Sequence, residues 1–363
     1  MKKLVAVKPR VAALIEYTDR PVQPDEVKIV VEAASPKHGT EVADFRGQTP
    51  FIDEEFSEEW RMFMPRTEGA KGIVFGELPL GNMIVGKISE LGDEVVDYEI
   101  GDLVCTYGPV METVIVTGVD NHRLRKMPEG AKWQNAVCYD PAQFALSGVR
   151  DANVRAGDYT VVVGLGAIGQ IAVQLAKKAG AHLVIAVDPI SHRRKVALRN
   201  GADIALDPTT IDVGFEIKKL TNKIGADSII ETSGNAAALQ GALKGIAFGG
   251  TISYVAFGKS FPEGLNFGRE AHFNNAKIIF SRAASEPNPD YPRWDRKRIE
   301  DTCWELLMNG YLNCEEIIEP VIPFQKSAEA YIKYVDQNPE LSIKMGVEFE
   351  RGAVQNPKLV PEA

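Results

Sequence analysis

The segment from Thr160 to Asp188 carries glycines and a carboxylate at the spacing that dinucleotide binding requires. A β-branched apolar run precedes the glycines, a helical pattern follows them, and a second apolar run ends in Asp188. In such a unit the first glycine permits a tight turn, the second lets the backbone approach a pyrophosphate, and the third lets the helix pack close to the sheet. The helix start then offers free N–H groups and a positive dipole end to the diphosphate. The cofactor-binding residues predicted from this motif are Gly164, Leu165, Gly166, Ala167, Ile168 and Gly169.

Asp188 discriminates between the two nicotinamide cofactors. Its carboxylate would accept hydrogen bonds from the adenosine ribose hydroxyls and would repel a 2′-phosphate, so the sequence favours NAD over NADP. Arg193 follows closely and is predicted to contact the cofactor as well. The run of basic residues His192, Arg193 and Arg194 weakens the preference for NAD.

Three later residues are predicted to line the nicotinamide pocket. Ligands of doubly wound sheets bind outside the carboxyl ends of the strands. Ser233, Val255 and Phe257 each follow or end a strand-like run in this part of the chain. The alternative is that they are ordinary strand-end residues.

The elements that must position these residues change character along the chain. Up to residue 150 the chain reads mostly as strands punctuated by glycine and proline, with Val27, Ile29 and Val31 on one strand face. From Tyr159, short apolar runs alternate with helical stretches, which is typical of βαβ units and a parallel sheet. The sequence thus predicts an α/β protein with a β-rich domain and a doubly wound parallel sheet. Strands are expected at 27–32, 83–88, 103–107, 160–163, 182–187, 228–231, 251–256 and 277–280, and helices at 168–178, 191–199, 236–246 and 297–310.

Two segments have no clear period. Residues 50–71 are rich in Phe, Glu, Met and Trp and are interpreted as an insertion: a lid, an interface or a packed surface loop. Residues 351–363 are interpreted as a frayed tail.

Composition excludes several classes of partner. The net charge of −9 disfavours binding to a nucleic-acid backbone. No run approaches the roughly eighteen apolar residues of a membrane span, and the apolar run at the N-terminus is too short for a secretion signal. The four cysteines are scattered without a CxxC pair, so a reduced, cytoplasmic chain is expected.

Over residues 1–345 the chain resembles the medium-chain dehydrogenase/reductase superfamily, in the branch of zinc alcohol, threonine and polyol dehydrogenases. The resemblance rests on the coenzyme motif and, in order along the chain, on residues 39–41, 81–86, 101–104, 140–142 and 249–251. It implies a GroES-like catalytic domain formed by residues 1–148 and 286–363, with a Rossmann NAD-binding domain inserted at 149–285.

The positions of the superfamily's catalytic zinc ligands are altered. They carry His38, Asn82 and Asp140, with Met83 where the family has a glutamate. Asn is a poor zinc ligand, no cysteine is present at these positions, and the four-cysteine structural lobe is missing. We therefore expect an enzyme without a metal. A weak metal site at His38 and Asp140 is the main alternative.

Within the superfamily, residues 37–41, 139–144, 268–272 and 285–294 resemble zinc-independent bacterial glycoside 3-dehydrogenases. The resemblance implies NAD-dependent oxidation of the C3 hydroxyl of a D-guloside or related hexoside to the 3-keto sugar. The alternatives are a polyol dehydrogenase with a residual metal site, a zinc-free quinone-type reductase, and a nucleotide-binding protein without activity. The expected partner is a small sugar, and the superfamily implies a homodimer or homotetramer, joined through residues 251–257 and 277–280.

Without zinc, side chains must accept the hydroxyl proton and stabilise the developing alkoxide. We expect Lys37 or His38 to be the general base, Asp140 to orient it and Thr40 to relay the proton. An ordinary lysine is too basic for this role near neutral pH, whereas a histidine is suited to it. The residues expected to bind the sugar are Asn82, Glu41, His272 and Arg293.

Overall fold

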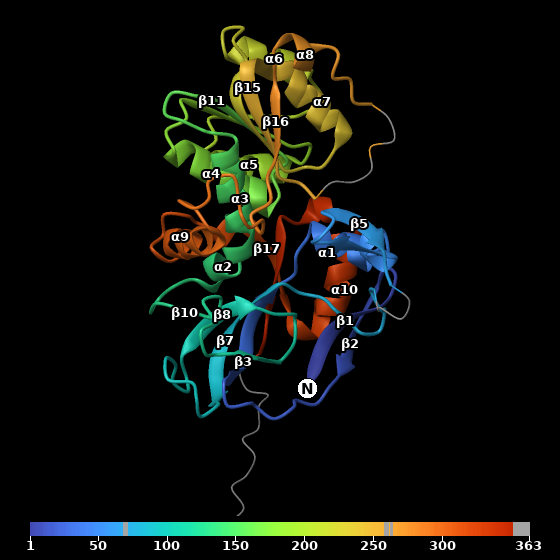
Figure 1. The fold of residues 1–363 in the computed structure, drawn as a ribbon, viewed down its shortest axis with the longest axis vertical. Coiled ribbons are helices and arrows are strands. Elements are labelled where there is room, and N and C mark those ends of the chain that lie inside the picture. The colour runs from blue at the N-terminus through green and yellow to red at the C-terminus, as the bar shows by residue number, and fades with distance from the viewer. Residues whose placement is uncertain (68–71, 258–260, 262–263, 351–363) are drawn as a thin grey trace, which may run out of the picture.

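The fold is built around two large β-sheets, one parallel and one mixed. The structure is a computed structural model that describes residues 1–67, 72–257, 261 and 264–350. Figure 1 shows a parallel sheet in the upper half of the molecule and a mixed sheet in the lower half. Helices α2 (Trp133–Ala136), α3 (Tyr139–Asp151) and α9 (Arg296–Met308) lie between them. None of the helices among the described residues has the length and hydropathy needed to cross a membrane.

The parallel sheet has six strands in the order β13-β12-β11-β14-β15-β16. The order reverses between β11 and β14, which is the switch point where doubly wound sheets bind ligands. Its central strands are apolar on both faces because helices cover both sides. The strands are β11 (Tyr159–Val163), β12 (Leu183–Val187), β13 (Ile204–Leu206), β14 (Ala226–Glu231), β15 (Ile246–Tyr254) and β16 (Lys277–Phe280). The helices are α4 (Ala167–Lys178), α5 (Ser191–Arg199), α6 (Val213–Leu220), α7 (Ala236–Gly245) and α8 (Glu270–Phe273).

The mixed sheet combines strands from the two ends of the chain. Its long strand β3 (Glu26–Ser35) alternates buried and half-buried residues, with Val27, Ile29 and Val31 in the core as predicted. The C-terminal strand β18 (Lys344–Glu348) pairs with β3 on one side and with β17 (Ile318–Pro323) on the other. The remaining strands are β7 (Met83–Leu91), β8 (Leu103–Tyr107), β9 (Thr113–Thr117) and β10 (Arg125–Lys126).

Smaller elements pack around the mixed sheet. A three-stranded sheet contains β1 (Lys2–Lys8), β2 (Val11–Glu16) and β6 (Leu78–Pro79). The short helix α1 (Thr40–Phe45) follows β3, and its Phe45 packs edge-on against Tyr331 of α10 (Ser327–Tyr331), with ring centroids 4.9 Å apart.

Helix α3 connects the two sheets. Its first turn carries Asp140, and near its other end Gly148 packs against the parallel sheet. A Cβ atom at Gly148 would lie 2.6 Å from Val255 Cγ2 and 3.3 Å from Ile230 Cγ2. Any shift of this helix therefore moves Asp140 relative to the cofactor end of the sheet.

The structure confirms the predicted fold class and the predicted strands and helices, with small differences at their ends. The region 50–71 differs from the expectation of an irregular insertion: it contains a hairpin of β4 (Glu54–Ser57) and β5 (Met62–Pro65). Both strands are only half-buried or exposed, so they lack the regular apolar alternation that would have revealed them. Residues 68–71 and the expected tail at 351–363 lie outside the described residues. The domain limits remain predictions.

Candidate active site

The glycine motif forms a turn at the carboxyl end of β11. Gly164 has φ +85°, in the left-handed region, and a Cβ atom there would lie 2.8 Å from the Ser233 nitrogen. A Cβ atom at Gly169 would lie 1.8 Å from the Gly164 carbonyl oxygen, so this position needs glycine for close packing. A Cβ atom at Gly166 would meet no protein atom within 4 Å. Gly166 immediately precedes α4, so the helix N-terminus borders open space, which the binding of a diphosphate there requires.

Asp188 is held in place by the backbone of this turn. It is 4% exposed, and its Oδ2 accepts a hydrogen bond from the Leu165 nitrogen at 2.8 Å. Its Oδ1 accepts one from the Ile190 nitrogen, also at 2.8 Å. Each oxygen keeps a lone pair that a ribose hydroxyl can use.

Arg193 points toward the C-terminal part of the chain. Its guanidinium donates to the carbonyl oxygens of Ser342 (2.7 Å) and Pro339 (2.6 Å), and it lies 3.9 Å from Asp188 Oδ2. Its expected contact with the cofactor remains a prediction. The structure shows that Arg193 also joins α5 to the segment that precedes β18.

The predicted nicotinamide residues lie at the carboxyl ends of β14 and β15. The Ser233 hydroxyl contacts the carboxylate of Glu231, whose pKa is raised by burial. Val255 is buried against Gly148, and Phe257 is 44% exposed. These three residues therefore lie at the same end of the parallel sheet as the first turn of α4.

Lys37 and Asp140 form an ion pair. Lys37 Nζ lies 3.1 Å from Asp140 Oδ2 and 3.4 Å from Oδ1, and it lies over the Phe144 ring at 4.8 Å from the centroid. Asp140 is 6% exposed and occupies the first turn of α3, where the helix dipole favours a negative charge. The structure thus brings together the predicted base and the carboxylate expected to orient it.

His38 is hydrogen-bonded to β18. Its Nε2 accepts a hydrogen bond from the Met345 nitrogen at 2.9 Å. Burial lowers the pKa of His38 well below its usual value, and the cations of Lys344 and Arg193 lower it further. The ring is therefore neutral, with its proton on Nδ1 and its Nε2 lone pair already used. It can donate a hydrogen bond to a substrate, but it has no free lone pair, so the geometry favours Lys37 over His38 as the base.

Sequence reasoning missed Lys344. This side chain is 3% exposed, and its Nζ donates to the Pro36 carbonyl oxygen at 2.6 Å. Burial lowers its pKa, while Asp140 and Glu41 act in the opposite direction. A signal was present, because Lys344 interrupts the apolar run Ile343–Val347.

Asn82 and Glu41 differ in their availability to a substrate. Asn82 Nδ2 is buried and has no hydrogen-bond partner among the described residues, so a bound hydroxyl would satisfy it. Glu41 is already bonded within the protein, because its Oε2 accepts from the Gly81 nitrogen and its Oε1 from the Tyr331 hydroxyl, both at 2.8 Å. Burial raises the pKa of Glu41 to about 7. Thr40 begins α1, directly after the turn that carries His38.

His272 does not join this cluster, contrary to expectation. It lies in α8, which leads into the amino end of β16. The predicted cofactor residues lie at the carboxyl ends of the parallel strands, which face the rest of the site, so α8 is at the opposite end of the sheet (Figure 1). The direction of the strands therefore separates His272 from the candidate site.

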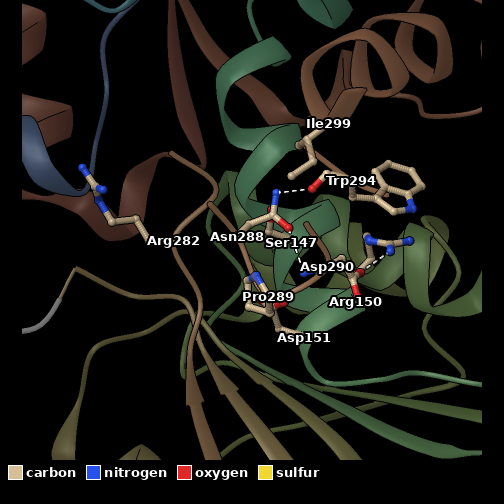
Figure 2. A pocket seen from close by; sticks show the side chains of 9 residues that line it. All are labelled: Ser147, Arg150, Asp151, Arg282, Asn288, Pro289, Asp290, Trp294 and Ile299. Carbon is tan, nitrogen blue, oxygen red and sulfur yellow. Dashed lines mark hydrogen bonds and ion pairs between the residues drawn. The ribbon is translucent and has the colours of Figure 1, made fainter. Parts of the chain in front are cut away.

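Arg293 is also separated from the cluster. Its loop is anchored to the far end of α3, where Arg150 pairs with Asp290 and stacks over Trp294 at 3.8 Å (Figure 2). Arg150 lies about 15 Å along the helix from Asp140, at 1.5 Å of rise per residue. The side chain of Arg293 is 74% exposed and lies 3.7 Å from Asp290. The small cavity in Figure 2 thus lies where this loop packs against α3, and its lining residues bond to one another.

The residues at the family's zinc position do not fit a zinc ion. His38 Nε2 is used by a backbone N–H, Asp140 is paired with an ammonium, and Asn82 is a poor ligand. Lys344 adds a second cation, which would repel a dication. Within the described ranges, no group of three or more His, Cys, Asp or Glu residues is arranged to hold a metal.

Comparisons with known proteins identify the family of the chain. A family model described as zinc-binding dehydrogenase matches residues 167–296. The chain is 69% identical over 350 residues to the D-guloside 3-dehydrogenase of Escherichia coli K12. The alignment covers 96% of this chain and 100% of that enzyme. It is 30% identical over 215 residues to an L-threonine 3-dehydrogenase of Caldanaerobacter subterraneus, covering 52% and 62%. Its fold matches the crystal structure of 2R,3R-butanediol dehydrogenase from Bacillus subtilis with a TM-score of 0.74, at 20% identity and with 96% and 99% of the chains covered.

Proposed function

Because this chain belongs to the medium-chain dehydrogenase/reductase superfamily and is an oxidoreductase that acts on CH–OH groups, we propose that it oxidises the C3 hydroxyl of a glycoside with NAD. The substrate class is a D-guloside or a related hexoside. The observation that carries this choice is the 69% identity to D-guloside 3-dehydrogenase across that protein's whole length.

The side chains support a mechanism without a metal. When bound, NAD supplies the acceptor for the hydride that leaves C3. Lys37 first releases its ammonium proton to solvent, and the neutral amine then takes the hydroxyl proton. Asp140 holds Nζ in place and stabilises the ammonium that forms again. His38 donates from Nδ1 to the substrate oxygen, Thr40 relays the proton, and Asn82 Nδ2 binds a sugar hydroxyl.

Asp188 supports NAD over NADP. The carboxylate is fixed beside the glycine turn by two backbone N–H groups, so it cannot turn away from a 2′-phosphate without losing both bonds. The pairing of Arg194 Nη2 with Asp207 at 2.9 Å reduces the positive charge available to bind such a phosphate.

The proposal is tested by following NADH absorbance during incubation with methyl D-gulosides and other methyl hexosides. We expect turnover with gulosides, at least about 100-fold slower turnover with NADP, corresponding to roughly 2.7 kcal/mol, and no loss after dialysis against a chelator. The variant Lys37→Met should bind NAD normally and lose turnover. Lys177→Met, which breaks the surface pair with Asp203, is the matched control and should keep it.

Three results would contradict parts of the proposal. Binding of NAD without turnover of any glycoside would remove the assigned activity. Reduction of quinones by NADPH would point to a reductase instead. Activity that disappears with chelator and returns with zinc would overturn the metal-free mechanism.

A further inference from the structure

We propose that Lys344 is the fixed cation of this active site and supplies the positive charge that a metal ion supplies in zinc-dependent dehydrogenases. This inference rests on the proposed oxidation of a hydroxyl group. Lys344 belongs neither to the glycine motif nor to the residues proposed to transfer the proton, and the inference gives it a role.

The position of Lys344 is fixed by the strand that carries it. Two consecutive residues of β18 bind the corner between β3 and α1. Lys344 Nζ donates to the Pro36 carbonyl at 2.6 Å, and the Met345 nitrogen donates to His38 Nε2 at 2.9 Å. The Met345 carbonyl in turn accepts from the Ser35 hydroxyl at 2.7 Å. Three hydrogen bonds therefore attach the corner that presents Lys37 and His38 to two consecutive residues of β18.

The charge on Lys344 is unusual for its surroundings. Among the lysines that the structure describes, Lys344 alone is buried. A buried ammonium is costly unless it is paired, and Pro36 occupies one of its three donor positions. Burial lowers the pKa of Lys344, while Cys138, Asp140 and Glu41 act to raise it and Lys37 lowers it further. The protein thus keeps a buried lysine next to the residues assigned to proton transfer.

The proposed reaction develops negative charge that a cation can stabilise. As the hydroxyl proton passes to the amine of Lys37, the C3–H electron pair leaves as hydride to NAD and the C–O bond becomes a carbonyl. Negative charge develops on the oxygen when proton transfer runs ahead of hydride transfer, and a fixed positive charge nearby lowers the energy of that state. Lys344 exchanges no proton in this scheme and is a positioning and electrostatic residue.

The variant Lys344→Met tests the proposal, because methionine has similar volume and no charge. We expect kcat to fall about 100-fold, a size typical of losing one group that stabilises developing charge. The KM for the glycoside and the Kd for NAD should change less than about 3-fold. The primary isotope effect with a C3-deuterated glycoside should increase as hydride transfer becomes rate-limiting. The Tm should change little, because the loss of the hydrogen bond to Pro36 is offset by the removal of an incompletely paired buried charge.

Two further variants separate charge from structure. Lys344→Arg keeps a cation and should retain at least ten times the kcat of Lys344→Met. Lys218→Met is the matched control, because Lys218 Nζ also donates to a backbone carbonyl, that of Ile246, at 2.6 Å, but far from the site. It should leave kcat and the isotope effect unchanged.

Unchanged kcat in Lys344→Met would overturn the proposal. A clear fall in its Tm, with NAD binding lost in parallel, would do the same by showing a structural role. The Tm comparison does not depend on the substrate. If the wild-type protein turned over no glycoside, the proposed function would fail, while a lower Tm in Lys344→Met would separately reject the buried-cation role.

Discussion

Glu41 is a half-buried residue, and desolvation of its carboxyl group raises the pKa to about 7, against an ordinary value of 4.5. Between pH 4.5 and 7 the folded protein therefore keeps a proton that the unfolded chain has released. Stability must fall as the pH rises through this window and level off above it, by up to about 1.4 kcal/mol per pH unit from this group.

Glu41→Gln should remove this pH dependence. The amide stays neutral at every pH and can still bond to Gly81 and Tyr331. We expect the free energy of unfolding of the variant, relative to wild type, to increase by about 3 kcal/mol between pH 4.5 and pH 8. Denaturant titrations at several pH values measure it, with Glu58→Gln on the exposed hairpin as the control. Parallel pH profiles for Glu41→Gln and wild type would contradict the prediction.

At the level of residues, the sequence located part of the site. The glycine motif and Asp188 could be predicted because their roles depend on local backbone geometry. The resemblance placed Lys37 and Asp140 together, and the structure shows them paired. The tautomer of His38 could not be predicted, because it depends on Met345, more than 300 residues away in the chain. His272 and Arg293 were wrongly expected at the site because a local resemblance does not tell which end of a strand or helix a loop joins.

Helix α3 is the element that couples the two halves of the site. Gly148→Ala should push the helix away from β14 and β15, because its new Cβ would lie 2.6 Å from the branched, stiff side chain of Val255. Overpacking costs about 1–3 kcal/mol, which outweighs the gain of about 1 kcal/mol in helix propensity. We expect lower stability and a lower kcat, measured by denaturant unfolding and steady-state kinetics.

Gly241→Ala in α7 is the matched control for this prediction. A Cβ atom there meets nothing within 4 Å, so only the gain in helix propensity remains. The variant should be more stable by up to about 1 kcal/mol, with unchanged kcat. Similar effects of the two substitutions would show that α3 does not depend on this contact.

Most elements were predictable because their apolar periods are strong. The buried runs of β11 and β12 and the helical spacing in α4 are local signals. The hairpin at β4 and β5 lacks such a period because both of its strands are partly exposed. The pairing of β18 with β3 joins distant parts of the chain, and the sequence carries no local signal for it.

At the scale of the whole molecule, three exposed phenylalanines lie on the elements at one edge of the parallel sheet. Phe248, Phe273 and Phe280 are 73%, 77% and 78% exposed on β15, α8 and β16. β16 is the last strand in the order, so among the described residues one of its edges is free to pair. A free strand edge with large apolar side chains exposed on neighbouring elements is a place where another chain can pair. We propose that two copies of the chain join through this edge.

Phe280→Lys should weaken this assembly. We expect size-exclusion chromatography with light scattering to show a dimer or tetramer for wild type and a smaller species for the variant. Phe215→Lys is the control, because Phe215 is 56% exposed on α6, away from the edge strand, and should leave the mass unchanged. A monomeric wild type, or an unchanged mass for Phe280→Lys, would rule out this interface.

The attachment of β18 to the corner at Ser35–His38 has a consequence for the order in which the protein matures on the ribosome. Every strand of the parallel sheet precedes residue 281, so this sheet can form before the last strands have been synthesised. The corner that presents Lys37 leaves the ribosome early, and its contacts with Asp140 and β7 can form before its hydrogen bonds to Lys344 and Met345. A nascent chain therefore becomes able to hold a nucleotide before it becomes able to perform chemistry. The catalytic centre is assembled last, when the two ends of the polypeptide meet.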